Sequence, residues 1–234
     1  MKVFFVGFGP GDKELLTLKA KKLLDKADLI IYPGSIISEE FLEEFKAKKV
    51  DSQNMKLEEI VDLMERAVKD GRLVVRLQSG DPSIFGAIWE QIRELRKRNI
   101  ECEIVPGVSS VFASSATLGI ELTSPDLIGV AIVRPKGRTL VEDYLEELAK
   151  LPITIVVLLG AEKAEYIAEK VAKIRGYDEP CAVVYKASQK GEKKFFCTLR
   201  ELAKKIEEEG IKRTATIIIG KAVKGYEGRS HLYS

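Results

Sequence analysis

The sequence predicts an α/β protein of two domains, and three observations support this. Apolar runs of strand length alternate with segments of helical periodicity over most of the 234 residues. These runs are continuously apolar, which is typical of strands buried on both faces of a parallel sheet. The regular alternation pauses at residues 122–126, so we expect an N-terminal domain of residues 1–123 and a C-terminal domain of residues 124–234.

In the first domain, four buried strands are expected at residues 3–6, 29–31, 73–76 and 103–105. Apolar residues recur at helical spacing in the segments between and after them, at residues 13–25, 39–45, 57–69, 84–97 and 108–118. In the fourth of these segments the apolar stripe, with Trp89 beside it, indicates core packing rather than a ligand site. Lys46, Lys48 and Lys49 are interpreted as a solvated helix face.

In the second domain, the same criteria predict strands at residues 129–133, 153–159, 181–185, 194–197 and 216–219. Helices are expected between them at residues 140–150, 163–175 and 199–209. Because strands alternate with helices, both sheets are expected to be mainly parallel, with helices on their faces.

Composition limits the possible functions. A net charge of +2 is too small to indicate a nucleic-acid or membrane partner. With His231 as the only histidine and no closely spaced cysteines, neither a metal site nor a histidine-dependent nucleophile is expected. Cys102, Cys181 and Cys197 suit reduced thiols. The apolar runs are too short for a signal peptide or a membrane span, so a cytoplasmic location is expected.

The first glycine-rich loop, residues 7–12 (GFGPGD), resembles a dinucleotide-binding loop but departs from it. Asp12 stands where the GxGxxG pattern has its third glycine, and Pro10 removes a backbone donor. A phosphate site favours free N–H groups without a neighbouring carboxylate. The loop therefore predicts a ligand without phosphate, and the alternative is a strand-to-helix turn with no ligand.

Loops after all four strands of the first domain contain glycine and proline. They are residues 9–12, 32–35, 78–82 and 106–110. In a parallel sheet these loops share one edge, where ligands bind. Asp81 followed by Pro82, and likewise Ser109 or Ser110, have a structural alternative as helix N-caps. No GxxxxGK[ST] loop is present, which disfavours phosphoryl transfer. Because the residues suggest neither a nucleophile nor a metal site, we expect chemistry carried by a bound cofactor.

Three of these loops resemble the signatures of the tetrapyrrole methyltransferase family. Residues 6–12 (VGFGPGD) with 15–20 (LLTLKA) are similar to its opening, residues 76–86 (RLQSGDPSIFG) to its second signature, and residues 105–110 (VPGVSS) to its third. Residues 32–35 (YPGS), 122–127, 137–139 and 184–188 resemble the branch that methylates C11 of precorrin-4 or cobalt-precorrin-4. The resemblance covers nearly the whole chain.

This resemblance implies two α/β domains with S-adenosylmethionine bound in the cleft between them, S-adenosylhomocysteine as the product, a tetrapyrrole substrate and a homodimer. The residues at matching cofactor-binding positions are Pro10, Ser79, Gly80, Asp81, Ile84, Ser109, Ser110, Leu159 and Ala187. Candidate substrate-binding residues are Asp12, Tyr32, Gly34, Ser35, Arg76 and Lys186. Arg134, Lys136 and Arg138 are further candidates, because the substrate carries carboxylates. No catalytic residue is assigned.

Several alternatives remain at this point. The same scaffold could methylate another precorrin, an RNA or a protein, or serve as a non-catalytic binding protein. A nicotinamide-dependent oxidoreductase with a degenerate loop is disfavoured by Asp12. Whether the substrate contains cobalt is left open by the residues.

Overall fold

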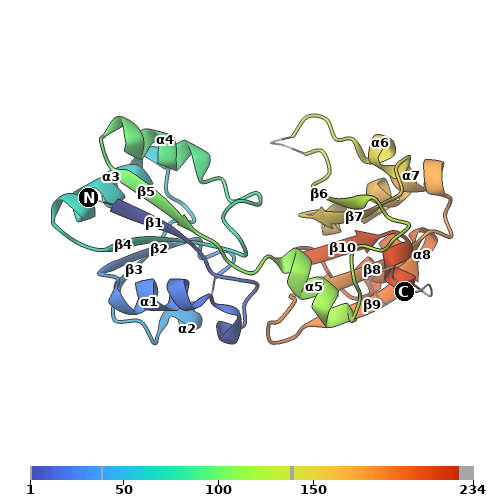
Figure 1. The fold of residues 1–234 in the computed structure, drawn as a ribbon, viewed down its shortest axis with the longest axis horizontal. Coiled ribbons are helices and arrows are strands. Elements are labelled where there is room, and N and C mark those ends of the chain that lie inside the picture. Colours follow the sequence, from blue (N-terminus) through green and yellow to red (C-terminus); the bar gives the residue numbers. More distant parts are fainter. Residues whose placement is uncertain (1, 38, 138–139, 227–234) are drawn as a thin grey trace. The chain divides into compact units, whose positions relative to one another are not determined.

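The structure is a computed structural model that describes residues 2–37, 39–137 and 140–226. It contains two compact units, Met1–Ser110 and Val111–Ser234, each built on a five-stranded sheet (Figure 1). Among the residues described, none of the helices has the length and apolar character needed to cross a membrane.

The first unit is a parallel sheet in the order β3-β2-β4-β1-β5. Its strands are β1 (Lys2–Gly7), β2 (Leu29–Tyr32), β3 (Lys48–Asp51), β4 (Val74–Gln78) and β5 (Glu101–Val105). All of its pairings are parallel, so the carboxyl ends of the strands share one edge. Side chains alternate between the two faces of each strand, and both faces are covered by helices.

One face packs against α1 (Leu18–Lys26) and α2 (Glu39–Leu42), and the other against α3 (Leu57–Lys69) and α4 (Trp89–Lys97). Strand β4 illustrates the two layers. Val75 lies in the core under α1 and α2, whereas Val74 lies in the core under α3 and α4. Short 3-10 helix η1 (Lys13–Leu15) follows the first loop, before α1.

The second unit has a mixed sheet in the order β6-β7-β10-β8-β9. Its strands are β6 (Gly129–Val133), β7 (Ile153–Leu158), β8 (Pro180–Tyr185), β9 (Lys193–Thr198) and β10 (Ala215–Ile219). Helix α5 (Ser110–Leu118) packs on one face through Val111 and Leu118. The other face is covered by α6 (Leu145–Ala149), α7 (Ala164–Arg175) and α8 (Leu199–Glu208), and 3-10 helices η2 (Ala161–Lys163) and η3 (Lys221–Lys224) complete the elements.

The expectation of mainly parallel sheets is confirmed in the first unit and wrong in the second. Strands β6 and β7 are parallel, but β10 runs antiparallel to both β7 and β8, and β8 is antiparallel to β9. The connection between β8 and β9 is short and contains no helix, so the two strands form a hairpin. Alternation of strands and helices alone does not reveal this reversal.

The division between the units lies between Ser110 and Val111, earlier than the boundary expected after residue 123. The physical reason is helix α5, whose buried residues pack with Val156, Ala182 and Ile218 of the second sheet. The apolar pattern predicted the helix correctly but did not indicate which sheet it covers.

Two elements of the first unit, β3 and α4, differ from expectation. Lys48 and Lys49 belong to β3, a charged edge strand, and not to a helix face. Helix α4 begins at Trp89 rather than at residue 84, because Phe85 and Ala87 have φ values of 51° and 48°, outside the right-handed helical region. Trp89 is 64% exposed, and Ile88, Ile92 and Leu95 form the buried stripe.

Helix α3 spans the expected residues, while α2 and α6 are shorter than the segments predicted at 39–45 and 140–150. The segment expected as one helix at residues 13–25 is divided into η1 and α1. The remaining strands and helices agree with expectation to within a few residues at their ends.

Candidate functional site

The three loops that carry the sequence motifs follow three neighbouring strands of the first sheet. Residues 8–12 follow β1, residues 79–83 follow β4, and residues 106–109 follow β5. Because these strands are adjacent and parallel in the order β4-β1-β5, the three loops meet at one edge of the sheet. The sequence prediction of a shared loop edge is therefore confirmed within this unit.

Backbone hydrogen bonds join the first two loops beyond the end of the sheet. The Phe8 N–H donates to the Gln78 carbonyl at 2.7 Å. Gly9 and Gly80 exchange two further bonds, from Gly9 N to Gly80 O at 3.1 Å and from Gly80 N to Gly9 O at 2.9 Å. Beyond the parallel β1–β4 pairing, the first loop is thus joined to the second by an antiparallel bridge between Gly9 and Gly80.

The third loop approaches the other two so closely that two glycines are required. A Cβ on Gly107 would lie 2.3 Å from the Gly80 carbonyl oxygen and 2.8 Å from the Gly7 Cα. Conversely, a Cβ on Gly7 would lie 2.5 Å from the Gly107 nitrogen. These atoms are backbone, which cannot rotate away as a side chain can, so Gly7, Gly80 and Gly107 form a three-way backbone contact, called here the glycine junction.

Asp81 connects the second loop to the third. One carboxylate oxygen, Oδ2, accepts the Gly107 N–H at 2.9 Å. The other, Oδ1, accepts the Ser83 N–H at 2.8 Å and the Ser83 hydroxyl. Partial burial opposes ionisation, but the hydrogen bonds from Ser83 and Gly107 outweigh it and hold the pKa of Asp81 below its ordinary value. The alternative role of Asp81 as a helix N-cap is wrong, since the next helix, α4, begins only at Trp89.

The small residues predicted to bind the cofactor surround this junction. Ser79 is half-buried, Ser109 is buried, and Ser110 begins α5. The Gly80 Cβ position lies 3.7 Å from the Ser110 nitrogen and 3.8 Å from the Ser109 Cα. The second and third loops therefore lie within van der Waals distance there.

Pro10 and Ile84, also predicted to bind the cofactor, belong to the segments that follow β1 and β4. Pro10 is buried in the first loop, and Ile84, which is half-buried, donates its N–H to the Asp81 carbonyl at 3.2 Å. The loops thus offer main-chain groups, hydroxyls and small side chains.

Asp12 and Thr17 organise the chain that leaves the first loop. An Asp12 oxygen accepts the Glu14 N–H at 2.9 Å and so caps η1. Thr17 caps α1 by accepting the Ala20 N–H at 3.1 Å, and its hydroxyl also donates to the Pro106 carbonyl at 3.5 Å. Thr17 was not among the predicted site residues. Its place directly before a helical segment could have identified Thr17 as an N-cap residue at this edge of the sheet.

Tyr32, Gly34 and Ser35 lie at the end of β2, and Asp51 at the end of β3 holds their loop. Asp51 accepts the Gly34 N–H at 2.8 Å and the Gln53 N–H at 2.9 Å. Tyr32 is only 6% exposed, and burial together with the charges of Glu39 and Asp51 raises the pKa of its hydroxyl. Ser35 is exposed. Sequence reasoning missed Asp51 because it missed β3.

Arg76 does not lie where a substrate could bind it directly. The side chain is 6% exposed, and Nε donates to the Gln91 amide oxygen at 3.0 Å while Nη1 donates to the Ile31 carbonyl at 3.3 Å. Burial lowers the pKa of Arg76 to about 10, partly opposed by the charge of Asp51. The prediction of Arg76 as a substrate-binding residue is corrected on this geometry, because its guanidinium is used inside the first unit.

In the second unit, strained backbone gathers at the edge of the sheet where β7 and β8 end and β10 begins. Leu159, Lys186 and Thr214 have φ values of 56°, 50° and 56°, and the Lys186 N–H donates to the Thr214 carbonyl at 2.9 Å. Left-handed conformations at non-glycine residues concentrate at functional sites. This edge contains the predicted residues Leu159, which is 69% exposed, and Ala187, which is buried.

Of the other basic candidates, Arg134 and Lys136 follow β6, which ends at the same edge of the second sheet as β7. The Lys136 N–H donates to Asp143 at 2.7 Å, and its Nζ lies 4.9 Å from the centre of the Tyr166 ring. Arg138, Thr139 and His231 lie outside the described residues.

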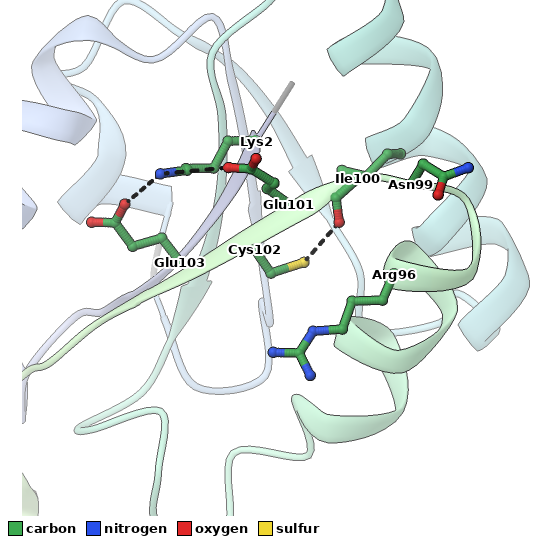
Figure 2. A pocket seen from close by; sticks show the side chains of 7 residues that line it. All are labelled: Lys2, Arg96, Asn99, Ile100, Glu101, Cys102 and Glu103. Carbon is green, nitrogen blue, oxygen red and sulfur yellow. Dashed lines mark hydrogen bonds and ion pairs between the residues drawn. The ribbon is translucent and has the colours of Figure 1, made fainter.

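A shallow cavity of about 490 Å³ lies at the opposite end of the first sheet (Figure 2). It is lined by the starts of β1 and β5 and the end of α4, including Lys2, Arg96 and Cys102. Lys2 pairs there with Glu103 at 3.0 Å, and burial raises the pKa of the Cys102 thiol. Lys2 is thus neutralised by an acidic neighbour, and the cavity is remote from the loop edge where the motifs meet.

Comparison with known proteins agrees with this geometry. The profile of the tetrapyrrole (corrin/porphyrin) methylases matches residues 2–203. The chain belongs to this family. A cobalt-precorrin-4 C(11)-methyltransferase of Methanocaldococcus jannaschii is 48% identical, over 99% of this chain and 92% of that protein. The predicted family resemblance is thus confirmed.

Two solved structures show the same fold. The crystal structure of a cobalt precorrin-4 methyltransferase, a cobalamin biosynthetic enzyme, matches with a TM-score of 0.91 and 37% identity, covering 95% of each chain. Uroporphyrin-III C-methyl transferase from Thermus thermophilus, in complex with S-adenosylhomocysteine, matches with a TM-score of 0.82 and 34% identity, covering 96% of this chain and 99% of that chain. The predicted α/β class of tetrapyrrole methylase type is confirmed.

In this tetrapyrrole methylase, Gly107→Ala tests the glycine junction. The added Cβ has no room, so we expect the free energy of unfolding to fall by about 1–3 kcal/mol, measured by urea denaturation. Gly129→Ala is the matched control, since a Cβ there meets nothing within 4 Å, and its effect should stay below about 1 kcal/mol. Equal effects of the two substitutions would contradict the junction.

Asp81→Asn tests the connection between the second and third loops. The pKa of Asp81 is lower in the folded state than in the unfolded chain. The ionised carboxylate therefore stabilises the fold fully above the unfolded pKa, about 3.9, and this stabilisation is lost as pH falls through the lower folded pKa. At pH 7 the variant should lose about 1–3 kcal/mol of stability, and this difference should shrink at acid pH. A difference that stays constant with pH would contradict the account. Asp178→Asn, at a side chain 87% exposed, is the control.

Proposed function

We propose that this chain transfers a methyl group from S-adenosylmethionine to C11 of cobalt-precorrin-4 or precorrin-4, in cobalamin biosynthesis. The observation that carries the proposal is the 48% identity to the Methanocaldococcus jannaschii cobalt-precorrin-4 C(11)-methyltransferase over 99% of this chain. The TM-score of 0.91 to a cobalt precorrin-4 methyltransferase supports it. The cobalt-containing substrate is the preferred one, because both of these relatives carry it in their names.

The loop edge of the first unit fits S-adenosylmethionine in its donor set. This ligand has an adenine, a ribose and an amino-acid group but no phosphate, so it needs main-chain and hydroxyl partners rather than a phosphate site. Ser79, Gly80, Ser109 and Ser110 supply such groups around the glycine junction. A uroporphyrin-III C-methyl transferase of the same fold is known in complex with S-adenosylhomocysteine, which supports the same ligand here.

Within this proposal the residues of the first unit have distinct tasks. Ser79, Gly80, Ser109 and Ser110 contact the cofactor, together with Pro10 and Ile84. Asp81 acts as a positioning residue, because both of its oxygens already accept hydrogen bonds from Ser83 and Gly107. Leu159 and Ala187 in the second unit, and the predicted cofactor cleft, stay predictions from the family resemblance.

The residues proposed to bind the substrate follow from the chemistry of the substrate. A tetrapyrrole of this class carries acetate and propionate side chains, which favour cationic and hydroxyl partners. Lys186 and Ser35 supply such groups, with Gly34 allowing the loop to approach Asp51 closely. Tyr32, whose side chain is buried, stays a candidate on the family resemblance alone. Asp12 is kept as a candidate, and Arg76 is left out because its guanidinium already donates to Gln91 and to the Ile31 carbonyl.

S-adenosylmethionine supplies an activated methyl group on a positively charged sulfur, which leaves as a neutral thioether. The protein therefore contributes mainly by holding the reactants in position, an effect worth up to about 7–11 kcal/mol. The glycine junction suits this task, because three loops joined through their backbones cannot shift independently. No residue is assigned as a general base. A homodimer and a cytoplasmic location are proposed on the family resemblance alone.

Binding of S-adenosylhomocysteine to the purified chain, measured by calorimetry, tests the cofactor site. We expect saturable binding that Ser110→Trp reduces at least about tenfold, a change of 1.4 kcal/mol, because Ser110 lies against Gly80. Ala116→Trp, at an exposed position of the same helix, should bind as the unchanged chain does. Absence of binding by the unchanged chain would overturn the methyltransferase proposal.

In the same assay series, cobalt-precorrin-4, precorrin-4 and uroporphyrinogen III are each incubated with the chain and S-adenosylmethionine. We expect one methyl group to be added to the precorrin-4 substrates at C11, detected by mass spectrometry and nuclear magnetic resonance. Cofactor binding without methylation of either precorrin-4 form would keep the cofactor site and reject the substrate.

A further inference from the structure

Two cysteines of the second unit lie directly opposite each other on neighbouring antiparallel strands. Cys181 of β8 pairs in register with Cys197 of β9. Their Sγ atoms are 3.2 Å apart. Opposite residues of an antiparallel pair have Cα atoms about 4.5–5.5 Å apart, within the range that a disulfide bond spans. The backbone is thus already positioned for a bond between the two sulfur atoms.

The surroundings of the pair favour a specific reaction over general oxidation. Cys181 is fully buried in the core under α8, whereas Cys197 is only partly buried. The hydrogen bond to Cys197 and burial raise the pKa of Cys181, while the hydrogen bond from Cys181 and the charge of Lys205 lower the pKa of Cys197 against the effect of burial. Cys197 is therefore the more reachable and the more readily ionised thiol.

We propose that Cys181 and Cys197 form a reversible disulfide bond linking β8 to β9, with a small-molecule disulfide as oxidant. The Cys197 thiolate attacks one sulfur of the oxidant, whose S–S bond breaks and releases one thiol. The Cys181 thiolate then attacks the Cys197 sulfur and releases the second thiol. The protein loses two electrons and two protons, which leave on the two thiols.

The bond has a physical consequence because β9 is an edge strand. Among the residues that the structure describes, β9 pairs with β8 alone, so this strand is held in the sheet by one ladder and opens at a lower free energy than the central strands. A link between residues 181 and 197 closes the hairpin and restricts the unfolded chain. Cys102, in the first unit, has its Sγ 3.8 Å from the Ile100 carbonyl and takes no part.

The test uses the full chain, reduced with dithiothreitol, freed of it and incubated with glutathione disulfide. We expect the intact mass to fall by two hydrogen atoms, and thiols titrated in denaturant to fall from three to one. Peptide mapping should recover Cys181 joined to Cys197. The melting temperature should rise on oxidation and return after reduction.

Two variants keep the result interpretable. Cys102→Ser retains the pair and should still lose two hydrogen atoms, leaving no free thiol. Cys197→Ser should show neither the mass loss nor the rise in melting temperature. The substitution lies at a half-buried position, so the packing of the buried Cys181 side chain in the core is kept. A stable glutathione adduct on Cys197, three persistent thiols, or a bond that includes Cys102 would each overturn the proposal.

Discussion

The close approach of Gly7 and Gly107 is the constraint on which the arrangement of the candidate site depends. A Cβ on either residue would meet backbone at 2.5 Å or less, so β1 and β5 can bring their loops together only with glycine at both positions. The carbonyl of Gly80 packs at the same point, and the backbone bonds between Gly80 and Gly9 hold the second loop against the first. Asp81 then adds a charged acceptor across the junction. A site formed in this way consists of main chain and small side chains, which suits a ligand that needs positioning more than acid–base chemistry.

The second sheet differs from the first in strand direction, yet it also concentrates irregular backbone at one edge. There the reversal of β10 brings Thr214 beside Lys186, and both have left-handed φ values. Such conformations cost on the order of 1–3 kcal/mol each and persist where the surroundings enforce them. The buried core of the sheet, which includes Val183 and Ile217, provides that support.

Much of this could be predicted from the sequence, because continuous apolar runs mark buried parallel strands and four glycine- and proline-containing loops mark their common edge. The charged strand β3 could not be predicted, because an edge strand that begins with Lys48 and Lys49 lacks the continuous apolar run by which the other strands were identified. The antiparallel course of β10 is set by tertiary pairing, which periodicity does not encode. The burial of Arg76 was missed because a strand residue near a loop does not reveal that Gln91 and the Ile31 carbonyl take up its donors.

Hydrogen exchange of the first unit with and without S-adenosylhomocysteine, followed by mass spectrometry, tests the central claim most directly. If the loops act as one body through the glycine junction, amides in residues 7–12, 78–83 and 105–110 should gain protection together on binding, while β3 stays unchanged. Protection confined to one loop, with the other two exchanging as in the free protein, would contradict it.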